Sequence, residues 1–360
     1  MRVIDEAALE DIALGAAVLG TGGGGDPYIG KLMARESLRR YGPVDLYTLD
    51  ELNDEDLIVP TAMMGALTVM VEKVPNGDDI VNAFLSVGKY IGKPVRATMS
   101  IEAGGLNSVV PIYAAARLRL PMVDCDGMGR AFPELQMVTH TIHGISATPM
   151  AMSDERGNTV IMETINNHWT ETFARSVTVD MGASAMIALY AATVAELKEA
   201  AVPDTITQAQ RIGETIRRAR LEEQDPVRTV RESVNGFTVF RGKISDVQRR
   251  TEAGFAKGDA FMTGIADYEG KELQLSFQNE HLAVRIDGYV CVTVPDLIAV
   301  LDIETGEPIT TEGLRYGFRV EVIAFACTPR WRSEAGLGLV GPRVFGYDVE
   351  YVPVEERYGQ

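Results

Sequence analysis

The chain has 360 residues, a formal net charge of -17 at pH 7 and a sequence pI of about 4.8. A protein with this charge repels nucleic acid and anionic membranes, and no block rich in Lys and Arg offsets the repulsion, so we expect neither as a partner. The length exceeds the roughly 250–300 residues at which a single core stops growing, which predicts two domains.

The cysteines and the amino-terminal residues predict a cytoplasmic location. Cys125, Cys291 and Cys327 lie far apart and form no CxxC pair, which is typical of a reducing compartment. The first residues lead directly into acids rather than into an apolar signal segment. No apolar run reaches the ~18 residues of a membrane span.

Strands and helices alternate along residues 1–168, as the spacing of apolar residues indicates. This alternation is typical of βαβ units with a mostly parallel sheet, in which ligands bind beyond the carboxyl ends of the strands. We therefore predict an N-terminal α/β domain over residues 1–168. The predicted helices cover residues 5–19, 29–40, 78–91 and 107–119, and the predicted strands cover residues 44–49, 57–60, 94–100 and 122–124.

Acidic side chains follow two of these strands. Glu102 comes just after the third strand, and Asp124 and Asp126 end the fourth. Because the carboxyl ends of parallel strands share one edge of a sheet, we expect these acids to converge in a partly buried cleft. Arg130 and Glu134 complete a charged cluster there. Burial beside other charges adjusts carboxylate pKa values for catalysis, although a structural Arg–carboxylate pair that steadies a loop is an equal alternative.

A glycine-rich segment at residues 20–27 follows the first predicted helix. Glycine permits positive φ angles and close backbone approach, so the segment can present N–H groups to an anion or a carbonyl oxygen. It is not a P-loop, because no Gly-Lys-Ser/Thr follows, and the alternative is a flexible linker. The candidate substrate-binding residues here are Thr21, Gly22, Gly23, Gly24, Gly25 and Asp26.

These patterns require no cofactor, and they leave open whether a divalent metal ion is bound. His140 and His143 would share a face of a helix, within reach of one metal ion. The β-branched residues around them favour a strand, however, in which residues three apart face opposite sides. If a metal ion is present, its candidate ligands are Asp124, Asp126, His140 and His143. Because the cysteines are scattered, we expect no structural zinc.

The pattern changes twice in the second half of the chain. Residues 181–200 and 205–223 read as two helices, which predicts a helical connector over residues 169–227. From residue 228 to residue 360, short strands separated by glycine turns predict a β-rich domain, barrel-like or sandwich-like. The expected strands cover residues 237–240, 243–247, 255–265, 272–277, 282–286, 289–294, 297–302 and 318–326.

A second glycine-dense segment, at residues 336–347, closes this domain. It contains one basic residue, Arg343. Two interpretations are open: a loop that reaches back to the cleft, or a structural tail that wraps the β-rich domain.

Four stretches together resemble the S-methyl-thiohydantoin desulfurase family, which is often linked to hydantoinases. The resemblance covers nearly the whole chain, and its long central motif is specific. It implies an N-terminal α/β domain, a C-terminal β-rich domain and chemistry at C2 of a five-membered thiohydantoin ring. The matching stretches are Gly20-Thr21-Gly22-Gly23-Gly24-Gly25-Asp26-Pro27, Glu102-Ala103-Gly104-Gly105-Leu106-Asn107, Asp124-Cys125-Asp126-Gly127-Met128-Gly129-Arg130-Ala131-Phe132-Pro133-Glu134 and Gly341-Pro342-Arg343-Val344-Phe345-Gly346-Tyr347.

The resemblance implies a hydrolase that removes sulfide or methanethiol from the ring with water. Such a reaction needs a base for the water proton and an acid or cation for the developing charge. Asp124 or Asp126 is the expected base, with Glu102 as a second acid–base candidate. Arg130 would orient the carboxylate of a small anionic substrate or a carboxylate of the enzyme, and Arg343 is a second candidate for the substrate carboxylate. The matching stretches also make Glu134 a catalytic candidate and Asn107 a substrate-binding candidate.

Two alternatives remain open from the sequence. One is a metal-dependent amidohydrolase that opens a hydantoin ring. The other is a non-catalytic subunit that binds and stabilises a hydantoinase. The chain is accordingly expected to form a homo-oligomer or to associate with a hydantoinase.

Overall fold

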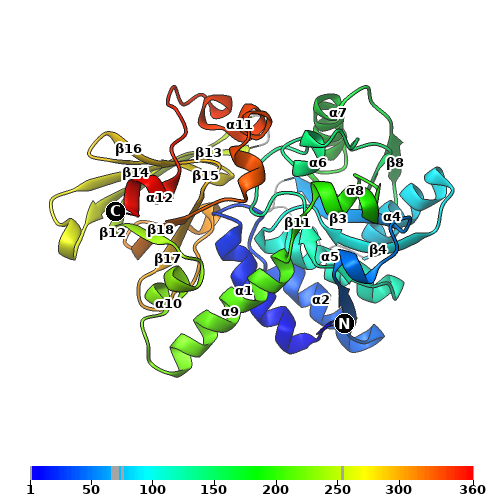
Figure 1. Cartoon of the computed structure of the whole chain (residues 1–360), viewed down its shortest axis with the longest axis horizontal. Coiled ribbons are helices and arrows are strands. Elements are labelled where there is room, and N and C mark those ends of the chain that lie inside the picture. The colour runs from blue at the N-terminus through cyan, green and yellow to red at the C-terminus, as the bar shows by residue number, and fades with distance from the viewer. Residues whose placement is uncertain (1, 66–72, 74–76, 253–254, 360) are drawn as a thin grey trace.

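The computed structural model describes residues 2–65, 73, 77–252 and 255–359. Two parts lie side by side, an α/β part built mainly from the first half of the chain and a β-rich part built from the second (Figure 1). The predicted fold class, an α/β domain followed by a β-rich domain, is confirmed. None of the described helices has the length and apolar character needed to cross a membrane.

The first part contains a nine-stranded sheet whose central strands run parallel. Its order is β1-β2-β5-β4-β3-β9-β7-β8, and β10 also pairs with β3. β2, β5, β4 and β3 run parallel to one another, while the strands on either side of this group pair antiparallel. The bounds are β1 (Arg2–Ile4), β2 (Val44–Tyr47), β3 (Leu57–Gly65), β4 (Val95–Ser100), β5 (Met122–Val123), β7 (Met150–Ser153), β8 (Thr159–Met162), β9 (Ser184–Ala188) and β10 (Ala192–Thr193).

Helices cover both faces of this sheet. Ile58 and Val59 are adjacent in β3 and therefore point to opposite faces. Ile58 is fully buried in a cluster with residues of α8 (Val194–Ala200), and Val59 in one with residues of α4 (Asp78–Ile91). Burial on both faces explains why β3 is apolar almost throughout, as parallel sheets require.

The parallel centre brings several strand ends to one edge. β4 ends at Ser100, and α5 (Gly105–Leu118) begins five residues later after a short bend. α5 contacts β3 and β4 and also packs against α1 (Glu6–Leu19) and α2 (Tyr28–Tyr41). The turn between β4 and α5 therefore lies at the carboxyl edge of the sheet, where ligands bind in folds of this class.

The stretch 181–200 is not the single helix that the sequence predicted. α7 (Asn167–Asp180) precedes it, and the stretch itself forms β9, β10 and α8. β9 pairs antiparallel with β3 and β7, so the predicted helical connector contains a strand of the first sheet. The prediction failed because a short apolar run buried on all sides has no periodicity that separates helix from strand. α8 begins only at Val194, after Thr193, whose side chain forms a capping box with Glu196.

α9 (Thr205–Leu221) runs alongside α1 with very close backbones. A Cβ atom on Gly15 would collide with the carbonyl oxygen of Ala209, and one on Gly213 would collide with the carbonyl oxygen of Asp11. The approach therefore requires glycine on both helices. α10 (Pro226–Ser233) follows and leads into the second part of the chain.

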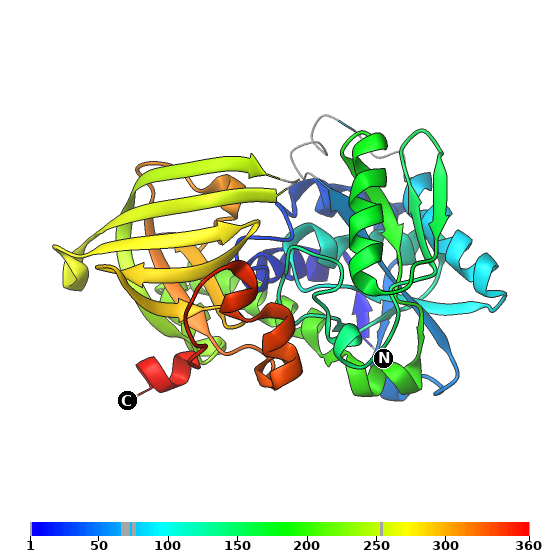
Figure 2. The same ribbon diagram turned by 90° about the horizontal axis from the view of Figure 1, so that it is seen from above.

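The second part is a curved antiparallel sheet of seven strands (Figure 2). Its order is β16-β15-β14-β13-β12-β18-β17, and β12 alone spans the two strands that the sequence predicted at 237–240 and 243–247. The bounds are β12 (Phe237–Glu252), β13 (Phe255–Gly264), β14 (Glu272–Gln278), β15 (Glu280–Ile286), β16 (Tyr289–Thr293), β17 (Leu297–Asp302) and β18 (Arg319–Phe325).

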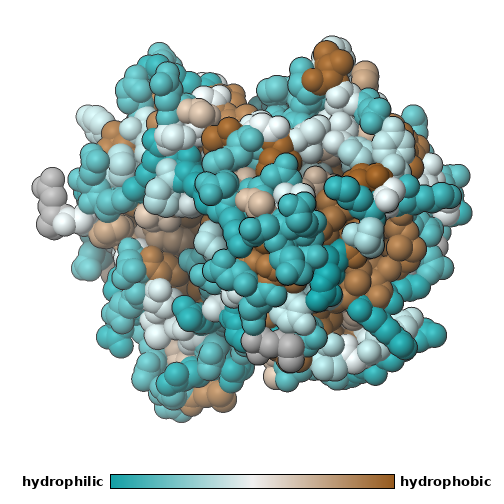
Figure 3. Space-filling view, turned by 45° about the vertical axis from the view of Figure 1, so that its right-hand side comes forward, coloured by the Kyte–Doolittle hydropathy of each residue, from teal (hydrophilic) through white to brown (hydrophobic). Residues whose placement is uncertain are grey.

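Short helices complete the chain after β18. They are α11 (Glu334–Val340), η5 (Pro342–Phe345) and α12 (Val354–Tyr358). Residues 336–347 form most of α11 and the whole of η5 rather than an irregular loop. The face of the molecule in Figure 3 is mainly hydrophilic, with separate smaller apolar groups.

Candidate functional site

The glycine segment is a joint between the two parts of the protein. Gly22, Gly24 and Gly25 have φ angles of 85°, 67° and 79°, which glycine adopts at no steric cost. The carbonyl oxygen of Thr21 accepts from the amide of His281 at 2.7 Å, and that of Gly22 from the amide of Thr311, also at 2.7 Å. Both donors belong to the β-rich part of the chain.

Close packing explains why the segment is rich in glycine. A Cβ atom on Gly23 would overlap the carboxyl group of Glu280, and one on Gly24 would lie 2.6 Å from the Cα atom of Gly104. The carbonyl oxygen of Gly24 accepts from the amide of Leu106 at 2.8 Å. Among the candidate residues of this segment, only Gly24 lines the cavity described next, and Asp26 lies on the surface.

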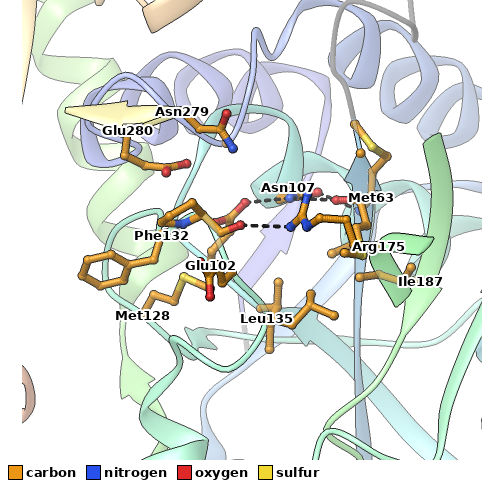
Figure 4. Close-up of a pocket in the computed structure, with 17 residues that line it drawn as sticks. Met63, Glu102, Asn107, Met128, Phe132, Leu135, Arg175, Ile187, Asn279 and Glu280 are labelled. Atoms are coloured by element: carbon orange, nitrogen blue, oxygen red, sulfur yellow. Dashed lines mark hydrogen bonds between the residues drawn. The ribbon is translucent and has the colours of Figure 1, made fainter. Parts of the chain in front are cut away.

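A cavity of about 80 Å³ lies where the carboxyl edge of the first sheet meets the hairpin between β14 and β15 (Figure 4). Both parts of the protein contribute to its walls, which carry charged and apolar side chains. The lining residues are Gly24, Ala62, Met63, Met64, Gly65, Ile101, Glu102, Asn107, Met128, Phe132, Pro133, Glu134, Leu135, Arg175, Ile187, Asn279 and Glu280.

Glu102 is a buried carboxyl group on one wall of this cavity. It follows β4, is 6% exposed, and its Oε1 atom accepts a 2.6 Å hydrogen bond from Asn107 Nδ2. Asn107 is held in turn by Met63, whose amide donates to Asn107 Oδ1 at 2.8 Å and whose carbonyl accepts from Nδ2 at 3.2 Å. Burial raises the pKa of Glu102 to about 7, against the lowering effect of Asn107.

Glu280 approaches the cavity from the opposite, β-rich wall (Figure 4). It is 2% exposed, and its Oε2 atom has no hydrogen-bond partner among the residues that the structure describes. Burial raises the pKa of Glu280 well above its usual value, and the nearby Glu102 raises it further, while Arg130 lowers it. Because like charges repel, ionisation of one of these two buried carboxyl groups disfavours ionisation of the other.

Arg175 is the only basic residue among the described residues that line the cavity. It comes from α7, its Nε donates to the carboxylate of Glu171, and Nη2 donates to the carbonyl oxygen of Pro133 at 3.3 Å. The guanidinium lies 4.2 Å from the ring centroid of Phe255. These contacts hold the guanidinium at the wall of the cavity that Glu102 and Glu280 also line, where it could bind an anionic ligand.

Sequence reasoning missed Glu280 and Arg175. Glu280 was overlooked although it stands in a polar run, Gln278-Asn279-Glu280-His281, between two apolar strands, and a buried hairpin of that composition is itself a signal. Arg175 lies in a helix whose other residues give no such indication. Glu134, which the sequence did predict, lines the cavity and accepts from Gln136 Nε2.

Asp124 lies outside this cavity, which corrects the expectation that the acids at the end of β5 face the cleft. Its Oδ1 atom accepts from the amides of Ile206 and Thr207 at 2.9 and 3.1 Å, and its Oδ2 atom from the Thr207 hydroxyl and Arg2. Asp124 therefore caps the N-terminus of α9 from a distant part of the chain. Asp204, in the usual capping position, makes no such side-chain bond.

Asp126 also lies outside the cavity, in β6 (Cys125–Asp126). Its Oδ1 atom accepts from the amides of Met128 and Gly129 at 3.2 and 2.8 Å, which fixes the glycine turn after the strand. Burial raises the pKa of Asp126 well above its usual value, and Glu102 adds to the effect. Asp126 Oδ1 thus supports the turn, while its Oδ2 atom is buried without a hydrogen-bond partner among the described residues.

Arg130 connects the two parts of the protein and does not line the cavity. It is fully buried, and burial lowers its pKa to about 10. The N–H groups of its guanidinium already donate to protein oxygens, which leaves the predicted role in substrate binding without support. The acceptors are Thr21 Oγ1 at 2.8 Å and the carbonyl oxygens of Ala131 at 3.0 Å, Pro295 at 3.0 Å, Asp296 at 2.7 Å and His281 at 3.3 Å.

Arg343, the other predicted cation, is exposed in η5 and forms an ion pair with Glu350. It lies outside the cavity. The basic residue that the cavity contains is therefore Arg175 and neither of the two arginines expected from the sequence.

The two predicted histidines do not share a site. They lie in and just after α6 (Thr139–Ile142), a helix where the sequence favoured a strand. Neither ring nitrogen of buried His140 has a hydrogen-bond partner in the described part of the chain, and burial lowers its pKa to about 3, whereas His143 lies beside Arg330. Within the described ranges, no three His, Cys, Asp or Glu side chains are placed to hold a metal ion together.

The comparisons with known proteins agree with this architecture. A crystal structure of a protein from Chromobacterium violaceum is similar over 98% of this chain and 100% of its own, with a TM-score of 0.81 and 21% sequence identity. No curated protein matches the chain. The family models of the S-Me-THD-like N-terminal domain and the S-Me-THD-like C-terminal domain match residues 7–164 and 165–354. The chain belongs to the S-Me-THD-like family.

Proposed function

We propose that this protein hydrolyses the bond between C2 and sulfur in a thiohydantoin or S-methyl-thiohydantoin, releasing sulfide or methanethiol. The observation that carries the proposal is the pair of buried carboxyl groups, Glu102 and Glu280, on opposite walls of one cavity. Membership of the S-Me-THD-like family supports the substrate class. The geometry favours this pair because Glu102 and Glu280 line the cavity, whereas Asp124 and Asp126 do not.

Glu102 acts as the general base in this mechanism. Its pKa of about 7 lies near a neutral working pH, where a base is both ionised in part and strong enough to accept a proton. Water gives a proton to Glu102 while its oxygen bonds to C2 of the ring. Asn107 keeps the carboxylate oriented toward the cavity through its 2.6 Å hydrogen bond.

Glu280 acts as the general acid, because its raised pKa keeps it protonated while Glu102 is ionised. As the bond between C2 and sulfur breaks, Glu280 gives its proton to the departing sulfur. The second proton of water goes to the ring nitrogen when the substrate is S-methylated, or to sulfur when C2 carries a thione. The product is the intact hydantoin ring with a carbonyl group at C2.

Arg175 binds a carboxylate on the substrate side chain. A protein of net charge -17 repels small anions, so an anionic substrate requires a local cation. Arg175 is that cation among the described lining residues. This assignment gives the proposed substrate class: a thiohydantoin with an acidic side chain.

The test is to incubate the purified protein with the thiohydantoin, S-methyl-thiohydantoin and plain hydantoin propionates, measuring free thiol and ring opening separately. We expect thiol release with the ring intact, and a roughly hundredfold or greater loss of that activity in Glu102→Gln. Glu304→Gln is the matched control, since Glu304 is an exposed acid that pairs with Arg319. Opening of the plain hydantoin without thiol release would refute the proposal in favour of an amidohydrolase.

A further inference from the structure

The turn between β14 and β15 carries a side-chain amide that can donate into the cavity. Asn279 is the single residue between the two strands, and it lines the cavity. Its Oδ1 atom accepts from the amide of Ala256 at 2.9 Å, which identifies the other end of the side chain as the nitrogen. Nδ2 has no acceptor among the described residues. In Figure 4 this nitrogen lies on the side of Asn107.

The turn itself does not require an amide, as a second turn of the same sheet shows. Asn279 has a φ angle of 58°, and its main-chain amide donates to the carbonyl oxygen of Ala256 at 2.8 Å. Asp287, between β15 and β16, has a φ angle of 50°, donates to the carbonyl oxygen of Glu272 at 2.9 Å and accepts from the amide of Glu272 at 3.0 Å. Asparagine and aspartate both tolerate this backbone region. Both turns therefore use only the Oδ1 acceptor, which a carboxylate supplies as well as an amide.

The surroundings of the two turns differ. Asp287 is exposed and lies outside the cavity, whereas Asn279 lines the wall opposite Glu102. A carboxylate in place of Asn279 would share the cavity with Glu102 and Glu280 and add a third like charge, while an amide brings two N–H donors. The amide thus gives the cavity a hydrogen-bond donor that the turn does not consume.

The other side-chain amide of the cavity is fully engaged. Nδ2 of Asn107 donates to Glu102 Oε1 and to the carbonyl oxygen of Met63. The glycine segment, which the sequence offered for binding a carbonyl oxygen, contributes only Gly24 to the cavity walls. Among the described lining residues, Asn279 is therefore the side-chain amide that can donate to a ligand.

The start of β13 positions Asn279 and Arg175 together. The ring of Phe255 lies against the guanidinium of Arg175, 4.2 Å from its centroid. The next residue, Ala256, holds Asn279 through two hydrogen bonds. Adjacent residues of one strand therefore fix the cation and the amide relative to each other, as the orientation of one ligand at two points requires.

We propose that Asn279 is a catalytic residue whose Nδ2 atom donates a hydrogen bond to the C4 carbonyl oxygen of the substrate ring. The inference rests on the proposed function and adds to it the group that binds the ring. When water adds to the C2=N3 double bond of the S-methylated ring, the electron pair of that bond moves to N3. N3 shares this charge with the C4 oxygen until it takes the second proton of water. A hydrogen bond to that oxygen strengthens as the charge develops, which lowers the barrier.

The thione form of the substrate provides a contrast. When water adds to its C2, the electron pair of the C=S bond moves to sulfur and not to the C4 oxygen. The bond from Asn279 then orients the ring without stabilising the developing charge. The proposal therefore predicts that the two substrates depend on Asn279 to different degrees.

The experiment compares Asn279→Gly and Asn279→Asp with the wild type in the thiol-release assay. Glycine suits the positive φ angle, and aspartate keeps the acceptor for Ala256 while removing the donor. For the S-methylated substrate we expect kcat to fall roughly hundredfold in both variants, the scale of one lost donor to a developing oxyanion. For the thione we expect a loss of about tenfold or less in Asn279→Gly. The acidic limb of the pH profile should stay in place in Asn279→Gly, because Asn279 is not among the groups that set the pKa of Glu102.

Asp287 provides the matched controls, because it forms the same turn outside the cavity. Asp287→Gly loses the same side-chain hydrogen bond as Asn279→Gly, so we expect similar losses of thermal stability in these two variants. Only Asn279→Gly should lose activity. Asp287→Asn keeps the acceptor and should match the wild type in both measurements.

Three outcomes overturn the role of Asn279. Full activity of both Asn279 variants, beside a wild type that releases thiol, removes this role and leaves the proposed function intact. Equal losses with the S-methylated and the thione substrates show that Asn279 does not stabilise charge on the C4 oxygen. A wild type that releases no thiol overturns the proposed function and the role of Asn279 together.

Discussion

Asn107 Nδ2 donates a 2.6 Å hydrogen bond to Glu102 Oε1, and both main-chain polar groups of Met63 hold the Asn107 amide in place. The side chain that orients the proposed base is thus fixed by β3, while the base itself follows β4. Two neighbouring parallel strands therefore determine one functional geometry.

Replacing the side-chain amide of Asn107 is expected to change the pKa of Glu102. Asn107 lowers that pKa, so Asn107→Ala should raise it above about 7. The acidic limb of the pH profile of kcat/KM then moves to higher pH, because the base is ionised only at higher pH. Asn279→Ala is the matched control, since Asn279 lines the opposite wall and bonds to the Ala256 amide. An unmoved limb in Asn107→Ala would contradict the role of the amide.

Glu102→Gln is expected to change how stability depends on pH. The pKa of Glu102 is raised by folding from 4.5 to about 7, so its contribution to the free energy of unfolding is fully present below pH 4.5 and is lost as the pH rises through 7. The full loss in the wild type is about 3 kcal/mol. Glu102→Gln cannot titrate at this position and therefore lacks this loss. Urea denaturation of both proteins at pH 5 and pH 8 measures how much the free energy of unfolding changes in each. Parallel changes in the two proteins would show that Glu102 titrates normally.

Asp124→Ala is expected to destabilise the fold without changing the chemistry. The substitution removes the cap of α9 and the partner of Arg2, at a cost of about 1–3 kcal/mol. The folded variant should keep its kcat, because Asp124 lies outside the cavity. Asp204→Asn is the control and should cost less, since that side chain makes no capping bond and asparagine also tolerates the left-handed backbone at φ 61°. A large fall in kcat of folded Asp124→Ala would return Asp124 to the list of candidate bases.

Arg175→Gln is expected to weaken binding of the anionic substrate selectively. Loss of a charged hydrogen bond of about 1.5–3 kcal/mol corresponds to a roughly ten- to hundredfold higher KM for the propionate. The KM of the corresponding neutral carboxamide should change little. Arg343→Gln tests the alternative arginine and should leave both values unchanged, because Arg343 is exposed and paired with Glu350. Equal effects of Arg175→Gln on the two substrates would exclude a contact with the carboxylate.

Local sequence patterns determined much of the fold and one member of the carboxyl pair. The strand predicted at 297–302 has the bounds of β17, and the glycine-punctuated strands do form the second sheet. Glu102 was found because it follows a strand of a parallel sheet, a position that the chain encodes within a few residues. Periodicity and turn residues are local properties, so the sequence carries them without reference to distant segments.

The tertiary structure decided which side chains meet. Glu280 faces Glu102 only because the β-rich sheet docks against the carboxyl edge of the first sheet, and Asp124 turns away only because α9 presents its free amides there. Ser184–Ala188 became a strand because β3 and β7 supplied its hydrogen-bond partners. Burial and partnership depend on segments far apart in the chain, and these long-range contacts set both the pKa values and the directions of the buried polar groups.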